Sequence, residues 1–342
     1  MLLPFLHKIA AGEDLSASEA HEAMLIILSG ATTTPQISAF LMGLRMKGET
    51  PEELLGFARA MREKTLRIDA CVEPEPLLDT CGTGGGAGST FNISTVAAFV
   101  VAGAGARVAK HGNRSFASQC GSADILEQLG VEVSQPPERV AQAIREIGIG
   151  FLFAPLLHPA MKHAQPARVE LKMRTVFNLL GPLTNPAGAT RQLIGAPSAH
   201  TAELLANALA GLGPERAFVV HGGGPDKAGL DEVTTTGTTL VFEITGSDVR
   251  SFHWTPADFG VEQASIEDLR GGDRARNSEI ATAVLKGQAG AQRDIVLVNS
   301  AAALIVSGIA DSPLAAMERA AHSIDSGAAW TKLRKLAEFS RG

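Results

Sequence analysis

The chain has 342 residues, 45% of them hydrophobic and 19% charged, and its formal net charge is −6. This length provides one large domain or two ordinary ones with a sizeable core. The acidic balance argues against nucleic acid as the main partner. No apolar run reaches the roughly 18–20 residues of a membrane span, and the first residues lack the basic region of a signal peptide. The three cysteines form no C-x-x-C pair, which indicates free thiols and a cytoplasmic location.

Residues 1–69 are expected to form a small bundle of four helices, at about 2–11, 16–28, 34–47 and 50–66. Ser16 with Glu19, and Thr50 with Glu53, have the spacing of capping boxes. Thr34, which precedes a proline, is expected to cap the third helix. Two interpretations stay open for the apolar residues of that helix, ordinary packing within the domain or a subunit interface: Ile37, Phe40, Leu41 and Leu44.

Residues 70–76 contain two prolines and are expected to be a linker, with an α/β domain at 77–342. From residue 77 onward short apolar runs alternate with helix-length segments, which predicts a mainly parallel sheet flanked by helices. The expected strands are 77–78, 108–109, 150–154, 193–195, 217–220 and an antiparallel hairpin at 240–254. The expected helices are about 92–104, 123–129 with Ser122 as its cap, 137–147, most of 158–188, 201–212, 278–286, 294–309, 313–326 and the segment from 331. Residues 131–133 are a short strand or a connector.

The stretch from Leu77 to Gly130 carries the main functional signal. A glycine-dense loop at residues 82–88 follows the first strand, and the polar run 92–95 begins the next helix. The second strand leads into Lys-His-Gly-Asn-Arg-Ser at residues 110–115. Glycines admit close approach of a ligand, and a helix N-terminus favours anions. Ligands collect where parallel strands end, so the sequence predicts a phosphate-rich ligand between two loops. Neither standard phosphate-binding glycine motif matches this loop.

The chain resembles the anthranilate phosphoribosyltransferase family in motifs that span most of its length: GTGGxxxxTFNIST, VAKHGNRSxxS, GSADxLExLGV, HPAMKHAQPARVELKMRTVFNLLGPLTNPAG and GLDEV. The resemblance implies a helical domain joined to an α/β domain of the nucleoside phosphorylase and class II phosphoribosyltransferase type, with helices from about 158–190 packing on the helical domain. It also implies a homodimer formed through the helical domain.

The implied reaction transfers the phosphoribosyl group of phosphoribosyl pyrophosphate (PRPP) to anthranilate, the second step of tryptophan synthesis from chorismate. The resemblance assigns no certain catalytic residue and gives positioning roles to Lys110, His111 and Arg168. It implies that PRPP is bound by Gly82, Gly85, Gly86, Thr90, Asn92, Ile93, Ser94, Thr95, Lys110, His111, Gly112, Asn113, Arg114, Ser115, Phe116, Ala117, Ser118 and Ser122. It implies that anthranilate is bound by Gly82, His111, Asn113 and Arg168.

Two Mg²⁺ ions per subunit are implied, and the ligands carried over are Ser94, Asp231 and Glu232. Adjacent carboxylates at a loop end suit Mg²⁺, which is usually held by one or two carboxylates and substrate phosphates. Taken alone, such a pair is more often the acidic start of a helix.

The chain departs from the family in two places. Gly86 occupies the position of the usual Asp in GTGGD, which predicts weaker affinity for Mg²⁺ or PRPP. The loop before Asp231 is extended at residues 223–228, where Asp226 and Lys227 either replace lost interactions or are solvated. Two alternative functions stay open: a pyrimidine nucleoside phosphorylase-like enzyme, and a nucleic-acid-binding paralogue without activity.

Overall fold

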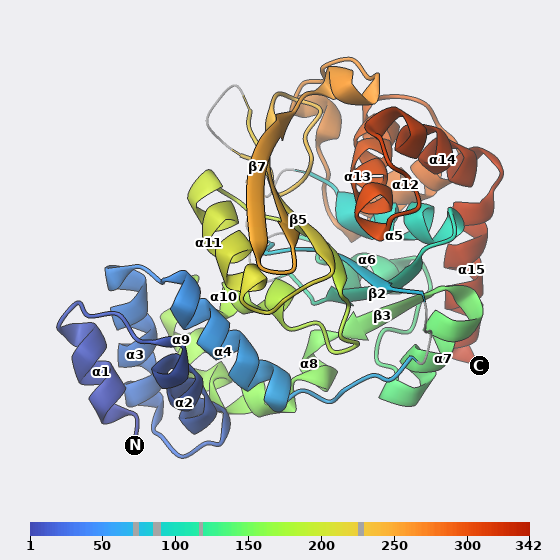
Figure 1. The fold of residues 1–342 in the computed structure, drawn as a ribbon. Helices are drawn as coiled ribbons and strands as arrows, with labels where there is room; N and C mark the ends of the chain where they lie inside the picture. Colours follow the sequence, from blue (N-terminus) through green and yellow to red (C-terminus); the bar gives the residue numbers. More distant parts are fainter. Residues whose placement is uncertain (71–74, 85–89, 116–118, 225–228) are drawn as a thin grey trace.

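A computed structural model describes residues 1–70, 75–84, 90–115, 119–224 and 229–342. Within these residues, one seven-stranded sheet organises the larger part of the molecule (Figure 1). Its strands are β1 (Leu77–Gly82), β2 (Arg107–Gly112), β3 (Ile149–Phe153), β4 (Arg191–Gly195), β5 (Arg216–Gly222), β6 (Thr239–Thr245) and β7 (Asp248–Trp254). They lie in the order β3-β2-β1-β4-β5-β6-β7. The first five are parallel, and β6 and β7 form the predicted antiparallel hairpin.

The order of the strands identifies where a ligand would bind. The chain runs outward from β1 to β2 and β3, and then returns to β4 on the other side of β1. The switch point of the sheet is therefore between the carboxyl ends of β1 and β4. In open parallel sheets, crevices for ligands open at this point.

The five parallel strands are buried on both faces, as expected for parallel strands. Along β5, Phe218 and Val220 belong to one core, and Ala217 and Val219 belong to the other. The first core lies beneath α5 (Ile93–Gly103), α12 (Arg274–Leu285), α13 (Ala291–Ser307), α14 (Pro313–Asp325) and α15 (Ala328–Arg341). Helix α5 is apolar on all sides because α13, α14 and α15 pack around it.

The opposite face is covered by α11 (Ala199–Ala210), while α7 (Pro137–Ile147) packs beside β3 at the edge. Short α6 (Ser122–Gln128) packs against α12. Two 3₁₀ turns, η3 (Pro256–Phe259) and η4 (Glu267–Leu269), connect the hairpin to α12.

A helical bundle adjoins this second face (Figure 1). It contains α1 (Leu3–Ala10), α2 (Ala17–Leu28), α3 (Thr34–Lys47) and α4 (Pro51–Glu63). The later segment α8 (Ala154–Leu157), η1 (Pro159–His163), α9 (Gln165–Leu171), α10 (Phe177–Leu180) and η2 (Gly181–Leu183) returns to it. Helix α3 packs on α9, α2 on η1, and α4 on both α10 and α11.

Both predicted capping boxes are confirmed. The Ser16 hydroxyl accepts the backbone N–H of Glu19 at 3.3 Å, and the Glu19 carboxylate accepts the backbone N–H of Ser16 at 2.8 Å. Thr50 and Glu53 repeat this exchange at 3.2 and 2.9 Å. Glu53 is fully buried because it also accepts from the Leu15 backbone and from the Lys47 ammonium.

Two local predictions were wrong, and of the two interpretations of the α3 residues the one of packing within the domain is confirmed. Thr34 is the first residue of α3, and the residue before it, Thr33, makes no side-chain cap. Ser122 likewise begins α6 after Gly121, and Asp124 accepts the Gly121 N–H at 2.8 Å instead. The α3 residues offered as a subunit interface are at most 1% exposed, because they form the core of the bundle: Ile37, Phe40, Leu41 and Leu44. Residues 131–133 are a connector.

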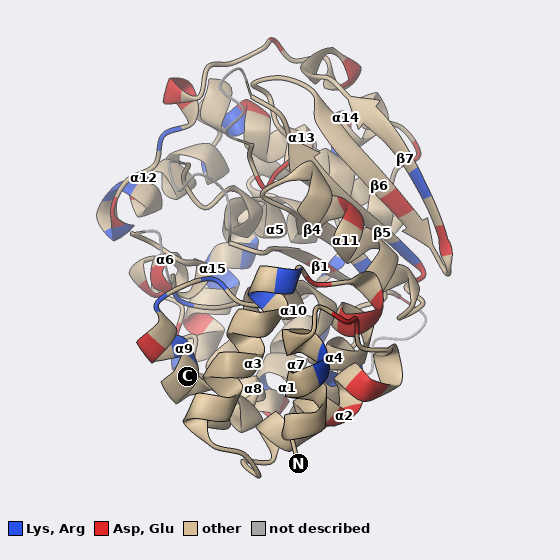
Figure 2. Ribbon diagram, turned by 90° about the vertical axis from the view of Figure 1, so that its left-hand side faces the viewer, with Lys and Arg blue, Asp and Glu red and all other residues tan. Residues whose placement is uncertain are grey.

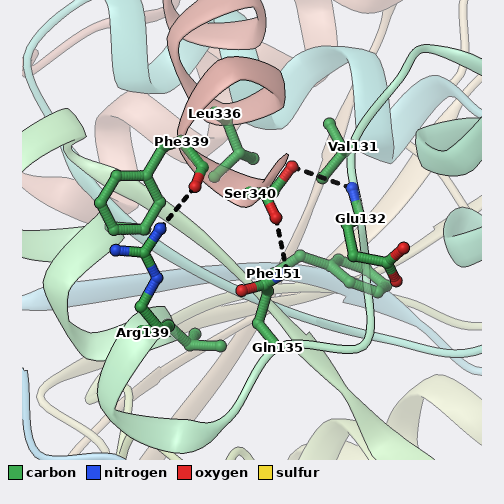
Figure 3. Close-up of a pocket in the computed structure, with 10 residues that line it drawn as sticks. Val131, Glu132, Gln135, Arg139, Phe151, Leu336, Phe339 and Ser340 are labelled. Atoms are coloured by element: carbon green, nitrogen blue, oxygen red, sulfur yellow. Dashed lines mark hydrogen bonds between the residues drawn. The ribbon is translucent and has the colours of Figure 1, made fainter. Parts of the chain in front are cut away.

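The last helix, α15, fastens the end of the chain to the sheet edge around a small cavity of about 20 Å³ (Figure 3). The Arg139 guanidinium lies 3.9 Å from the centroid of the Phe339 ring and donates to the Phe339 carbonyl at 2.7 Å. The Ser340 hydroxyl accepts the Glu132 N–H at 2.9 Å, and Gln135 donates to the Ser340 carbonyl at 2.8 Å. A cavity of this size holds about one water and no substrate.

Among the described helices, none combines the length and the apolar character needed to cross a membrane.

Candidate functional site

The residues predicted from the two loops meet at the switch point. Gly82 ends β1, and Lys110 and His111 belong to β2 rather than to the loop after it. The polar run at Asn92–Thr95 stands at the start of α5. Gly85, Gly86, Phe116, Ala117, Ser118, Asp226 and Lys227 lie outside the described residues.

Lys110 and His111 are buried, which the sequence did not predict. The Lys110 ammonium donates to the Thr80 carbonyl. Burial lowers the pKa of Lys110, and the neighbouring Asp79 carboxylate opposes that change. Asp79 is fully buried in β1, and burial raises its pKa. A buried charge is tolerated where it is paired and hydrogen-bonded, so Asp79 and Lys110 stabilise each other between the first two strands.

Asp79 also holds the end of β2 in place. It accepts the His111 backbone N–H at 3.0 Å and the Asn185 amide at 2.7 Å. Asn185 donates as well to the Ala109 carbonyl at 2.9 Å. The segment after η2 is thereby bonded to both β1 and β2 directly beneath the site. Asn185 lies in the GPLTNPAG motif, but nothing in the sequence indicates its partners.

The three predicted metal ligands are brought together from distant segments. The Ser94 N–H donates to the Glu232 carboxylate. A Cβ atom placed on Gly82 would be 3.4 Å from a carboxylate oxygen of Asp231. Gly195, at the end of β4, has no room for a side chain, because a Cβ atom there would lie 1.7 Å from the Asp231 carbonyl oxygen. Close contact with β4 therefore fixes the Asp231 loop at the switch point.

The electrostatics of this pair fit a divalent cation. Burial, and then the charge of Asp231, raise the pKa of Glu232 to about 8. Two carboxylates this close repel each other, and a cation between them would relieve the repulsion. No cluster of three His, Cys, Asp or Glu side chains exists in the described part of the chain. Two hard oxygen donors beside a phosphate site match Mg²⁺, which completes its shell with substrate phosphates and water.

Arg168 is a half-buried cation on α9. Partial burial lowers the pKa of its guanidinium, which lies 5.5 Å from the centroid of the Phe177 ring. Across the described residues no hydrogen-bond acceptor contacts this guanidinium. A planar carboxylate is the group that a free guanidinium pairs with best. Nearby, Arg174 donates to the Gly84 carbonyl at 3.0 Å and ties this segment to the glycine loop.

Two histidines link the strands to the helical bundle. The Nε2 atoms of His111 and His158 are 3.2 Å apart. His111 Nδ1 lies 3.1 Å from the Gly181 carbonyl, and His158 Nδ1 lies 2.9 Å from the Thr65 hydroxyl. Thr65 in turn donates to the Met61 carbonyl at 2.7 Å. Burial lowers the pKa of His111 to about 3 and that of His158 to about 4.

This chain of contacts is one proton short when both rings are neutral. It has four links and ends on two carbonyl acceptors, whereas Thr65, His158 and His111 together supply three hydrogens. One added proton would complete every link. Burial nevertheless lowers both pKa values, so the two rings stay neutral at pH 7 and take up this proton only in acid.

Arg114 is directed to α6 rather than to the strand ends. Its guanidinium makes a bidentate pair with Glu127 at 2.6 and 2.7 Å and reaches Asp124 at 3.3 Å. Ser122 exchanges hydrogen bonds with the Asn113 backbone at 3.1 and 3.2 Å. These contacts fasten the loop after β2 to α6.

Family comparisons agree with this geometry. Residues 3–65 match the helical bundle domain, and residues 74–330 the a/b domain, of a glycosyl transferase family. Anthranilate phosphoribosyltransferase of Solibacter usitatus is 60% identical over 99% of this chain and 98% of its own. The chain belongs to the anthranilate phosphoribosyltransferase family.

Two solved structures of anthranilate phosphoribosyltransferases have the same fold. The Thermus thermophilus protein matches with a TM-score of 0.90 and 41% identity, over 98% of this chain and 99% of its own. The Saccharomyces cerevisiae protein, solved in complex with PRPP and Mg, matches with a TM-score of 0.89 and 28% identity, over 99% and 98%. The predicted fold class is confirmed, and the family membership favours neither the phosphorylase nor the nucleic-acid-binding alternative.

Sequence reasoning missed three residues of the candidate site: Asp79, Thr65 and Arg174. Asp79 contacts His111, Arg174 contacts Gly84 of the glycine loop, and Thr65 contacts His158, which in turn contacts His111. Their partners are 32, 93 and 90 positions away in the chain. No local pattern signals contacts of that separation.

Proposed function

We propose that the protein transfers the phosphoribosyl group of PRPP to the amino group of anthranilate and releases pyrophosphate, the second step of tryptophan synthesis. The observation that carries this proposal is the carboxylate pair Asp231–Glu232, held at the switch point beside Ser94. The half-buried guanidinium of Arg168 would pair with a second, carboxylate-bearing substrate. Family membership supplies the identity of the substrates.

In this proposal PRPP lies between Gly82, the start of α5 and the end of β2. The first N–H groups of α5 and the residues at Asn92–Thr95 would bind its anionic groups. Ser94, Asp231 and Glu232 would hold Mg²⁺, and two ions per subunit are part of the proposal. When bound, Mg²⁺ neutralises charge on the pyrophosphate that leaves.

Anthranilate would pair its carboxylate with Arg168, with Asn113 and His111 beside it. The aniline nitrogen attacks the anomeric carbon while the bond to pyrophosphate breaks, and the bonding electrons leave with pyrophosphate. An aniline is nucleophilic at neutral pH, so the residues contribute mainly by orienting two substrates. The attacking nitrogen then sheds one proton, which passes to water, since the lowered pKa values of His111 and His158 keep both rings neutral at pH 7.

We also propose that the protein is a homodimer formed through its helical domain, but on a different face from the one the sequence indicated. Helix α3 carries exposed or half-buried apolar residues on its outer side: Pro35, Ala39, Met42 and Met46. Leu3 of α1 and Val169 of α9 are 37% and 51% exposed on the helices that flank it, and Met46 is 82% exposed.

The charged residues of α3 lie in its last turn, and the rest of the helix is drawn in tan in Figure 2, the colour of residues without charge. Apolar side chains repeated along one exposed helix face are typical of a surface that a second protein covers. A second copy of the chain would bury this face, which we define as the α1–α3–α9 face.

The finer assignments complete the proposal. The helical domain comprises residues 1–69 with the helices of 158–190, residues 70–76 are the linker, and residues 77–342 are the catalytic domain. The reaction is assigned to the cytoplasm. Cys81 and Cys120 are buried and form no disulfide bond, which is consistent with a reducing compartment.

Anthranilate fluorescence provides the test. Protein, PRPP, Mg²⁺ and anthranilate are mixed, and the fluorescence is followed with time. We expect a decay that requires both PRPP and Mg²⁺ and is lost in Arg168→Ala and Asp231→Ala. Arg139→Ala is the matched control, since Arg139 also lies over a phenylalanine ring but fastens α15. Absence of decay at micromolar wild-type enzyme would contradict the proposal.

A further inference from the structure

The segment before α12 lies directly on the residues that lead into α5. Thr90 and Arg270 form an isolated antiparallel bridge. Beside it, Gly271 is so close to Phe91 that a Cβ atom there would lie 2.7 Å from the Phe91 nitrogen. A part of the chain 180 residues away therefore positions residues 90–92, of which Thr90 and Asn92 are proposed PRPP contacts.

Two buried or half-buried amides continue this contact. The Gly272 N–H donates to Asn277 Oδ1 at 2.8 Å. Asn277 Nδ2 donates to Asn92 Oδ1 at 3.0 Å, and Asn92 Nδ2 donates to the Cys120 carbonyl at 3.0 Å. Asn277 is 2% exposed and also hydrogen-bonds the Cys120 thiol, so its amide is fully engaged within the protein.

The two ends of this relay determine which way both amides point. A backbone N–H can only donate, so the atom of Asn277 that faces Gly272 is an oxygen. A backbone carbonyl can only accept, so the atom of Asn92 that faces Cys120 is a nitrogen. The Gly272 N–H thus fixes the orientation of the Asn277 amide, and the Asn277 amide and the Cys120 carbonyl together fix the orientation of the Asn92 amide.

This orientation matters because Asn92 immediately precedes α5 and is partly exposed at the proposed PRPP site. Its oxygen is turned to Asn277, and one N–H is bonded to Cys120. Among the described residues the second N–H has no acceptor, so it can add a donor to those at the start of the helix. The opposite orientation would present oxygen lone pairs to an anionic group, which repels it.

We propose that Asn277 is a positioning residue for PRPP binding: it holds the Asn92 amide with its N–H side toward an anionic oxygen of PRPP. Asn277 does not touch the substrate and acts through Asn92. This inference rests on the proposed function, because it needs PRPP as the ligand.

The test compares substrate affinities in variants. Asn277→Asp keeps the size of the side chain but removes the donor to Asn92. We expect the KM for PRPP, and the dissociation constant of PRPP with Mg²⁺ from calorimetry, to rise about tenfold, the range for a lost hydrogen bond to a charged group. The KM for anthranilate should stay unchanged. Asn277→Ala, which introduces no charge, should shift the same constants in the same direction.

Two comparisons separate positioning from a general structural role. In an Asn92→Ala background, Asn277→Asp should weaken PRPP binding no further. Ser323→Ala removes another buried hydrogen bond to α5, from the Ser323 hydroxyl to the Val100 carbonyl at 2.7 Å. We expect this control to lower thermal stability and leave both KM values unchanged.

The outcomes are distinct. If wild-type protein neither binds PRPP with Mg²⁺ nor consumes anthranilate, the proposed function is wrong and the inference fails with it. If wild type is active but both Asn277 variants bind PRPP as wild type does, the inference alone is wrong. An equal loss of affinity for both substrates, or an undiminished effect in the Asn92→Ala background, also overturns it.

Discussion

The buried pair of His111 and His158 should make the stability of the fold depend on pH. Burial lowers the pKa of His158 from 6.5 to about 4. Below pH 6.5 the unfolded chain takes up a proton at His158 that the folded chain refuses until about pH 4, so acid favours unfolding. Stability is therefore complete above pH 6.5 and is lost as the pH falls toward 4.

The size of this loss follows from the two pKa values. Their difference, 6.5 minus about 4, corresponds to about 3 kcal/mol at 1.36 kcal/mol for each pKa unit. In the variant His158→Gln this dependence is absent. Between pH 7 and pH 4, the wild type should lose about 3 kcal/mol more free energy of unfolding than the variant. His111, whose pKa burial and the neighbouring His158 lower to about 3, adds a loss of its own that begins below pH 6.5 and continues to about pH 3.

Urea titrations at pH 7, 6, 5 and 4 measure this difference. His7→Gln is the control, since His7 is an exposed histidine on α1. It should parallel the wild type throughout. Parallel curves for the wild type and His158→Gln would refute the reasoning, because they would mean that His158 takes up its proton equally well in the folded chain.

Three further outcomes are expected. Glu232, whose pKa is raised to about 8 first by burial and then by Asp231, should release a proton when Mg²⁺ binds at pH 7. Calorimetry of Mg²⁺ binding in buffers of different ionisation enthalpy detects the released proton, and heats that do not depend on the buffer would contradict the release. The affinity for Mg²⁺ should also rise as the pH is raised toward 8. Gly195→Ala should lower kcat/KM about a hundredfold and leave the circular dichroism spectrum unchanged, because the new methyl group displaces Asp231. Full activity of this variant would refute the close contact between Gly195 and Asp231. Met46→Glu should convert the dimer to a monomer, as measured by light scattering. The control Leu314→Glu, which changes an exposed residue of α14, should leave the dimer intact. If both variants are dimers, the α1–α3–α9 face is not the dimer interface.

Features determined by neighbouring residues were predictable from the sequence. The capping boxes at Ser16 and Thr50 require residues three positions apart, and both formed as expected. The alternation of strands and helices likewise predicted the parallel sheet and its hairpin. The carboxyl ends of β1 and β2 lie on one edge of the sheet, as expected for neighbouring parallel strands, and Thr80 of β1 bonds the Ser94 carbonyl at the start of α5.

Features that depend on distant partners were not predictable. Lys110 and His111 were expected in a loop since they are polar, yet they lie inside β2 because Asp79 and the Gly181 carbonyl compensate their burial. Helix α3 is apolar on two sides, and composition alone does not indicate which side faces the core. The contact between Asn277 and Asn92 spans 185 positions, and neither residue signals the other.

The position of α15 has a consequence for synthesis on the ribosome. Residues Ala328–Arg341 cover α5 and the β3 edge, and Arg139 and Ser340 complete that contact. Helix α5 is made early, but α13, α14 and α15, which cover its apolar surface, are made much later. We expect the fold around α5 to be completed only once α15 has left the exit tunnel, so that chaperones have a long interval in which to bind the strand β1–β3 half of the domain.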